Sequence, residues 1–284
     1  MNTRVLDIHP HIITTDMEKY PRDPLGGNQS TWSRDRPATA EQLIAAMDAA
    51  GVARAAIVQA STCYGFDNTY VADAVAAYPD RFTGVFSVDM RAADAPGRIR
   101  HWVDRKLAGM RIFTAGSTMV GQGDWLADPA SFPAWDCAAE LGLPVCVQMR
   151  SAGMPQLQVL LDRYPQVKII IDHFLNPPLE DGPPYASADV LMGLAKHPNI
   201  YLKLTPMIVN STRKGLATPE SFFSRVIAEF GASRIAWGSN FPTNAGTLSE
   251  LLALCRSALS GAKAEDQEWI FHKTAESLYP ALKA

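Results

Sequence analysis

The chain has 284 residues, with 26 Lys and Arg against 29 Asp and Glu, giving a formal net charge of −3. Apolar residues make up 47% of it, enough for a large core, which excludes a generally disordered chain. No block of basic residues is present, so we expect no nucleic-acid partner. The four cysteines form no Cys-x-x-Cys pair, and neither a secretion signal nor a long apolar run is found. These features favour a soluble cytoplasmic protein with no membrane partner.

The apolar pattern alternates between short strands and amphipathic helices along the chain. Thr39 is predicted to cap a helix over 39–50, with Gln42 completing a capping box and Gly51 ending the helix. Strands are expected at Val5 and Leu6 and at 55–61, 82–88, 108–113, 143–149, 167–173, 200–204 and 234–240. Further helices are expected at 67–78, 95–105, 135–141, 154–164, 188–196, 219–230, 248–259 and 264–279.

Strands that are apolar along their whole length are typical of a parallel sheet covered on both faces. Eight such units predict a single domain over 1–284 with an α/β fold, a (β/α)8 TIM barrel that is distorted in places. An open doubly wound sheet is the alternative, which the absence of a Gly-x-Gly-x-x-Gly turn after the first strand makes less favourable.

His9 and His11 follow the first strand with one residue between them. Side chains two positions apart on a strand point to the same face, so the two imidazoles are expected to converge. Such a pair can hold a divalent ion or clamp a polar substrate. A surface turn with two unrelated histidines is the alternative.

In a TIM barrel the active site gathers at the carboxyl ends of the strands. Polar residues are predicted there on most strands: Gln59, Ser61, Arg111, Gln148, Asp172, His173, Lys203, Ser239 and Asn240. Each one alone is also explained by an ordinary hydrogen bond within the core, but the set favours a site. Long loops at 12–38, 114–130 and 175–187 are expected to shape the pocket. The other histidines, His101, His197 and His272, are expected to be structural.

Taken together, the motifs resemble the amidohydrolase superfamily, in its amidohydrolase-2 branch. The matching segments are 7–11 with the His-x-His, 57–61 with 65–68, 109–111 with Arg111, 171–173 with Asp-His, and 237–242, which is similar to Trp-Gly-Ser-Asp-x-Pro. Within the branch, the spacing is similar to hydrolases of the 2-pyrone-4,6-dicarboxylate lactonase type and to sugar-lactone hydrolases.

The resemblance implies that His9, His11 and His173 bind one divalent ion, zinc or manganese. The pyrone-type lactonases imply instead a metal-independent site, and both possibilities stay open. Two positions depart from the family pattern, because Gln148 replaces a His or Lys and Asn240 replaces an Asp. An amide has no useful basicity, so Asn240 is expected to orient water or ligate weakly.

His173 is therefore the candidate base, because imidazole titrates near neutral pH. Asp172 would point to the opposite face of a regular strand, so it is expected to be a supporting residue. Arg111 is expected to hold a substrate carboxylate or the developing oxyanion. Other expected substrate contacts are Gln59, Ser61, Gln148, Tyr64 and Trp32, with Phe66 and Phe241 as further pocket walls.

The predicted function is hydrolysis of a lactone, ester or amide bond in a small carboxylated or cyclic metabolite, by water that a metal or a histidine activates. A metal-dependent decarboxylase of an aromatic or muconate-like acid is the alternative. A barrel that binds without catalysis is a third reading. The expected partner is a small molecule, and a homodimer is an open prediction from the frequency of dimers among soluble enzymes.

Overall fold

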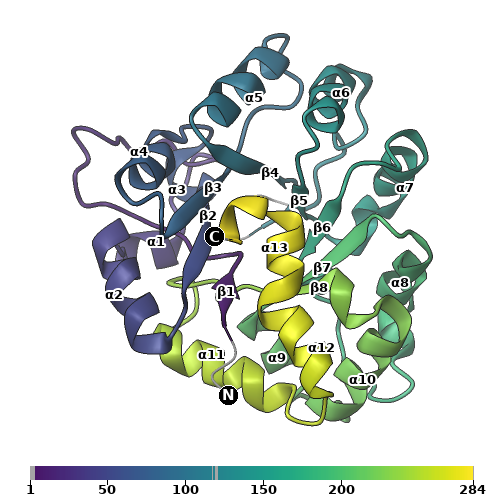
Figure 1. Cartoon of the computed structure of the whole chain (residues 1–284). Helices are drawn as coiled ribbons and strands as arrows, with labels where there is room; N and C mark the ends of the chain where they lie inside the picture. Colours follow the sequence, from purple (N-terminus) through teal and green to yellow (C-terminus); the bar gives the residue numbers. More distant parts are fainter. Residues whose placement is uncertain (1–3, 117, 119–120, 284) are drawn as a thin grey trace.

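The computed structural model describes residues 4–116, 118 and 121–283 of the chain, so residues 117, 119 and 120 of the predicted loop 114–130 lie outside the described residues. Eight parallel strands follow one another in chain order around one sheet (Figure 1). They are β1 (Leu6–Asp7), β2 (Arg54–Val58), β3 (Phe82–Phe86), β4 (Leu107–Phe113), β5 (Val145–Gln148), β6 (Ile169–Asp172), β7 (Ile200–Leu204) and β8 (Ile235–Trp237). The amide of Ile8 donates to the carbonyl of Trp237, so the sheet nearly closes and the predicted barrel is confirmed.

Helices cover the outside of the barrel (Figure 1). Helix α2 begins with the predicted capping box, since Thr39 and Gln42 bond to each other's backbone amide, and Gly51 ends it in the left-handed conformation. The α-helices are α1 (Thr31–Asp35), α2 (Ala40–Ala50), α3 (Ser61–Tyr64), α4 (Thr69–Ala77), α5 (Ala95–Asp104), α6 (Phe132–Glu140), α7 (Met154–Arg163), α8 (Asp189–Met192), α9 (Pro206–Ser211), α10 (Pro219–Phe230), α11 (Leu248–Ala258), α12 (Ala264–Glu268) and α13 (Thr274–Leu278). Among the described residues, no helix combines the length and the apolar character needed to cross a bilayer.

Some short elements differ from the sequence-based expectation. Helix α1 lies within the predicted loop 12–38, and α3 replaces the loop expected directly after the second strand. The predicted helix over 264–279 is interrupted by a π-helical turn at Trp269–Lys273. Helices of four or five residues have no measurable periodicity, and tertiary hydrogen bonds fix them: the carbonyls of Ser61 and Thr62 accept from the amides of Leu25 and Ser30.

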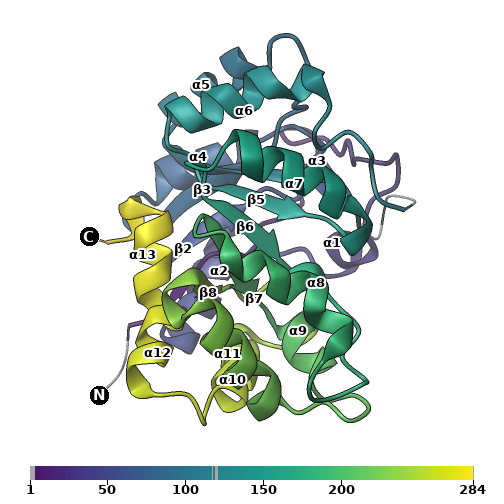
Figure 2. The same cartoon turned by 90° about the vertical axis from the view of Figure 1, so that its right-hand side faces the viewer.

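Side chains alternate between the inside and the outside of the barrel. On β7, Leu202 and Leu204 belong to the large outer core, whereas Lys203 between them points into the barrel. The apolar part of the interior includes Cys146 and Tyr279, the latter just after α13. Helix α13 crosses the open end of the barrel in Figure 1 and lies at the left in Figure 2, with α1 and α9 on the opposite side. The C-terminal segment therefore plugs one end, and the other end is left for a site.

Candidate active site

A cavity of about 870 Å³ opens at the carboxyl ends of the strands. The polar residues that line it include His11, Ser61, Arg111, Gln148, Asp172, His173 and Asn240. The larger apolar and aromatic lining residues include Trp32, Phe113, Leu175, Leu191 and Met207. The predicted loops 12–38 and 175–187 both contribute to the wall. A mostly apolar pocket with a few convergent polar groups is typical of a small-molecule site.

The two histidines of the His-x-His motif lie side by side, with ring centroids 4.8 Å apart, as their spacing predicts. His11 Nδ1 lies 2.7 Å from the carbonyl oxygen of Val58, which only accepts hydrogen bonds. The proton of neutral His11 is therefore on Nδ1, and its Nε2 keeps a free lone pair. His9 is fully buried beneath the cavity wall, with its ring centroid 5.2 Å from that of His173.

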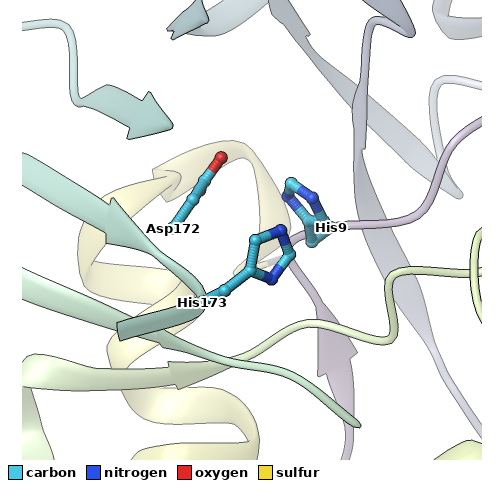
Figure 3. Close-up of side chains that lie close together, drawn as sticks. All are labelled: His9, Asp172 and His173. Carbon is cyan, nitrogen blue, oxygen red and sulfur yellow. The ribbon is translucent and has the colours of Figure 1, made fainter. Parts of the chain in front are cut away.

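His9, Asp172 and His173 form a buried cluster whose possible ligand atoms all lie within 4.8 Å of one another (Figure 3). His11 is not a member of this group. The expectation that Asp172 would face away from the site is wrong. Strand β6 ends at Asp172, and His173 adopts a left-handed conformation with φ of 52°, so the strand alternation stops and both side chains line the cavity.

Two buried cations flank the Asp172 carboxylate. Arg111 Nε donates to Oδ2 at 2.8 Å, and Lys203 Nζ forms an ion pair with Oδ1 at 2.6 Å. Burial disfavours the charged carboxylate, but Lys203 and Arg111 overcome this effect and hold the pKa of Asp172 well below its ordinary value. From the sequence, Lys203 is expected only to lie at a strand end, although a lysine between two leucines of a buried strand is unusual.

The three histidines of the site are neutral near pH 7. Burial, with the positive charge of Arg111, lowers the pKa of His11 to about 3 and that of His173 to about 4. Burial and the neighbouring Lys203 lower the pKa of His9 well below its ordinary value. The imidazoles therefore act as neutral donors or acceptors, and the positive charge of the site comes from Arg111 and Lys203.

Gln59 and Tyr64, both expected to contact substrate, lie outside the cavity lining. Gln59 Nε2 donates to two carbonyls of segment 65–67, and its Oε1 accepts from the Ser61 hydroxyl. The Tyr64 hydroxyl accepts from the backbone amide of Thr14. Both side chains thus hold the loops that carry other site residues. The expected contacts that do line the cavity are Trp32, Ser61, Arg111 and Gln148.

The turn after β8 brings Asn240 to the cavity. Asn240 has φ of 53°, a left-handed conformation that Asn tolerates, and its buried Nδ2 has no partner among the described residues. Asp7 ties this turn to β1, because its Oδ1 accepts from the amides of both His9 and Ser239. A Cβ on Gly238 would lie 2.5 Å from the Cβ of His9, so only glycine fits at this junction.

Known structures share this architecture across nearly the whole chain. A probable 2-pyrone-4,6-dicarboxylic acid hydrolase of Acinetobacter baumannii with citric acid bound has a TM-score of 0.77 at 17% identity, covering 98% of this chain and 99% of that one. An amidohydrolase of Burkholderia multivorans with bound zinc has a TM-score of 0.77 at 20% identity, covering 98% of this chain and 99% of that one. A 5-carboxyvanillate decarboxylase of Novosphingobium aromaticivorans with bound manganese has a TM-score of 0.67 at 16% identity, covering 98% of this chain and 97% of that one.

By sequence, the chain is 30% identical over 196 residues to L-fucono-1,5-lactonase of Burkholderia ambifaria, covering 68% of this chain and 66%, just under two thirds, of that protein. The Amidohydrolase family model, Amidohydro_2, matches residues 6–281. Because this match runs from β1 to the C-terminal segment that plugs the barrel, the chain belongs to the amidohydrolase-2 family.

Proposed function

We propose that this protein hydrolyses the lactone ring of a small carboxylated metabolite, without a resident metal ion. The observation that carries the proposal is the charge of the cavity. Among the described residues, the ionisable ones that line it, apart from the neutral histidines, are Arg111, Arg150 and Asp172, which leaves an excess of one positive charge. A positive, partly enclosed pocket favours an anionic substrate, and a guanidinium matches a carboxylate or an oxyanion by paired hydrogen bonds.

In this reaction, water attacks the lactone carbonyl and gives up a proton to His173 as the ring C–O bond breaks. The ring oxygen then takes that proton, and the product is a hydroxy acid. The Nδ1 of His173 lies 2.8 Å from Thr205 Oγ1, which leaves Nε2 to exchange the proton. The terminal nitrogens of Arg111, whose Nε already binds Asp172, remain to bind the substrate.

The donor set at the site does not fit a resident divalent ion. Two members of the His9, Asp172 and His173 cluster already bind the Lys203 ammonium, at 2.8 Å from His9 Nδ1 and 2.6 Å from Asp172 Oδ1. Gln148 and Asn240 supply only amide groups. The pattern of the metal-dependent family members has an imidazole or a charged side chain at these two positions. A metal ion added beside Arg111 and Lys203 would be repelled by both.

The relatives support a lactone substrate. The sequence relative at 30% identity is an L-fucono-1,5-lactonase. The decarboxylase likeness rests on 16% identity and on a protein with bound manganese, so it supports the barrel rather than that reaction here.

The proposal is tested by assaying sugar lactones with and without a carboxylate, together with CO2 release from aromatic carboxylic acids. We expect acid production from the lactones, fastest for the carboxylated ones. The variant His173→Ala should reduce turnover by ~10²–10⁴-fold, the usual effect of losing an acid–base group. His101→Ala, an exposed histidine on α5, is the matched control and should be unchanged. CO2 release without lactone hydrolysis would overturn the proposal in favour of a decarboxylase.

A further inference from the structure

Lys203 occupies the centre of the buried polar group. Its side chain has no exposed surface, and its Nζ lies 2.6 Å from Asp172 Oδ1, 2.8 Å from His9 Nδ1 and 3.2 Å from Cys146 Sγ. An ammonium has three N–H donors and no acceptor, so these three neighbours match its donors. The aliphatic stem of the side chain comes from β7 inside the barrel, where the strands hold it in place.

This contact determines which nitrogen of His9 carries the proton. A neutral imidazole has one donor nitrogen and one acceptor nitrogen, and Nδ1 must accept because Lys203 can only donate. The proton of His9 is therefore on Nε2, an atom that is buried and has no partner among the described residues. His11 has the opposite arrangement, with its proton on Nδ1 and its lone pair on Nε2.

We infer that Lys203 is a built-in cation that takes, between His9 and Asp172, the place of a divalent ion and fixes His9 as a hydrogen-bond donor. The inference deepens the proposed function, because it gives a site without a metal ion a fixed positive charge beside Asp172 and a fixed tautomer at His9. A divalent ion would need a lone pair from both His9 and Asp172, and the Lys203 ammonium already lies 2.8 Å from His9 Nδ1 and 2.6 Å from Asp172 Oδ1.

The two histidines consequently differ at Nε2, which is a hydrogen-bond donor in His9 and an acceptor in His11. Two identical side chains would thus perform different tasks because Lys203 contacts one of them and the Val58 carbonyl contacts the other.

The tautomers can be measured directly on the wild-type protein by two-bond ¹H–¹⁵N correlation NMR of ¹⁵N-labelled imidazoles at pH 7. We expect an Nε2-protonated pattern for His9 and an Nδ1-protonated pattern for His11. The signals are assigned by their loss in His9→Gln and His11→Gln. An Nδ1-protonated His9 would overturn the inference, because that nitrogen could not then accept from Lys203.

The second test removes the cation. The variant Lys203→Met frees His9 and Asp172, and we expect it to bind Co²⁺ about 100-fold or more tightly than wild type, the scale of removing one unit charge a few ångströms away. Binding is followed by the visible absorption of Co²⁺ and by calorimetry, on protein whose circular dichroism matches wild type. Lys168→Met, which removes a lysine bonded to the Ser277 carbonyl at the plugged end of the barrel, is the control and should bind Co²⁺ no more tightly than wild type.

Equal Co²⁺ affinity in Lys203→Met and wild type would contradict the inference. If Lys203→Met does not fold, the NMR measurement on the wild-type protein decides alone. Neither test depends on turnover, so a protein with these tautomers and no lactone hydrolysis would refute the proposed function and leave the role of Lys203 intact.

Discussion

At the scale of single residues, the hydrogen-bond partner decides what each polar group of the site can do. Asp172 is held ionised by Arg111 and Lys203, so it is a poor base although it lies in the cavity wall. His173 has the carboxylate on one side and two cations nearby, and remains neutral down to a pH of about 4. His11 and His173 are both neutral imidazoles in this wall with a free Nε2. The pKa of His173, about 4, is lower than the near-neutral value expected from the sequence but higher than the value of about 3 for His11, so His173 is the better proton acceptor of the two.

Asn240 provides a test of this assignment, because it stands where the family resemblance has an aspartate. Asn240→Asp keeps the left-handed backbone, which Asp also tolerates, but removes the excess positive charge of the cavity. We expect kcat/KM for a carboxylated lactone to fall by about 10-fold, the effect of about 1.4 kcal/mol of lost attraction. Assays in chelator-treated buffer check this result. A gain in hydrolysis would contradict it, and would show that a carboxylate at position 240 acts as a general base that the wild-type protein lacks.

The spacing of His9 and His11 and the positions of Arg111 and His173 could be predicted, because strand ends gather in any parallel barrel. The roles of Asp172 and Lys203 could not, since one depends on a left-handed turn at His173 and the other on partners from β1, β5 and β6.

At the scale of elements, the junction between β8 and β1 sets the position of His9. Asp7 accepts hydrogen bonds from the amides of His9 and Ser239, and Gly238 lets the two segments approach. The predicted capping box of α2 shows that local elements are encoded locally, since Thr39 and Gln42 suffice for it. The junction, by contrast, joins segments more than 200 residues apart, and only the fold brings them together.

Gly238→Ala tests this junction. A methyl group there would lie 2.5 Å from His9 Cβ, so the end of β1 must shift and the Lys203–His9 hydrogen bond lengthens. We expect about a 100-fold loss of turnover from misplacement and a loss of roughly 1–3 kcal/mol in unfolding free energy from overpacking. Gly97→Ala is the control, because among the described residues no atom outside the adjoining backbone of α5 lies within 4 Å of its added Cβ. Wild-type turnover in Gly238→Ala would contradict a positional role for the junction.

At the scale of the whole molecule, burial of the histidines makes folding stability depend on pH. The unfolded chain protonates His11 and His173 below their ordinary pKa of 6.5, whereas the folded protein does so only near pH 3 and pH 4. Their contribution is thus complete above pH 6.5 and is lost as the pH falls toward 4, by about 1.4 kcal/mol per pH unit for each histidine. Burial raises the pKa of Asp7 to about 6, so this residue increases the folding stability as the pH falls from 6 to 3.8. In that range it offsets the stability lost through one histidine.

Urea unfolding at several values between pH 7.5 and pH 5 measures this effect. We expect the unfolding free energy to decrease toward pH 5, and His173→Gln to flatten the dependence by the contribution of one histidine. A stability that rises toward pH 5 would show that these imidazoles are not buried in their neutral form.

We propose that the amidohydrolase barrel of this protein acts without a resident metal ion. The most direct measurement is elemental analysis of protein purified without added metal, with lactone hydrolysis assayed before and after treatment with a chelator. We expect far less than one zinc or manganese ion per chain and the same turnover in both assays, because Lys203 already occupies the cation position between His9 and Asp172. One metal ion per chain, with activity lost on chelation and restored by the metal, would contradict the claim.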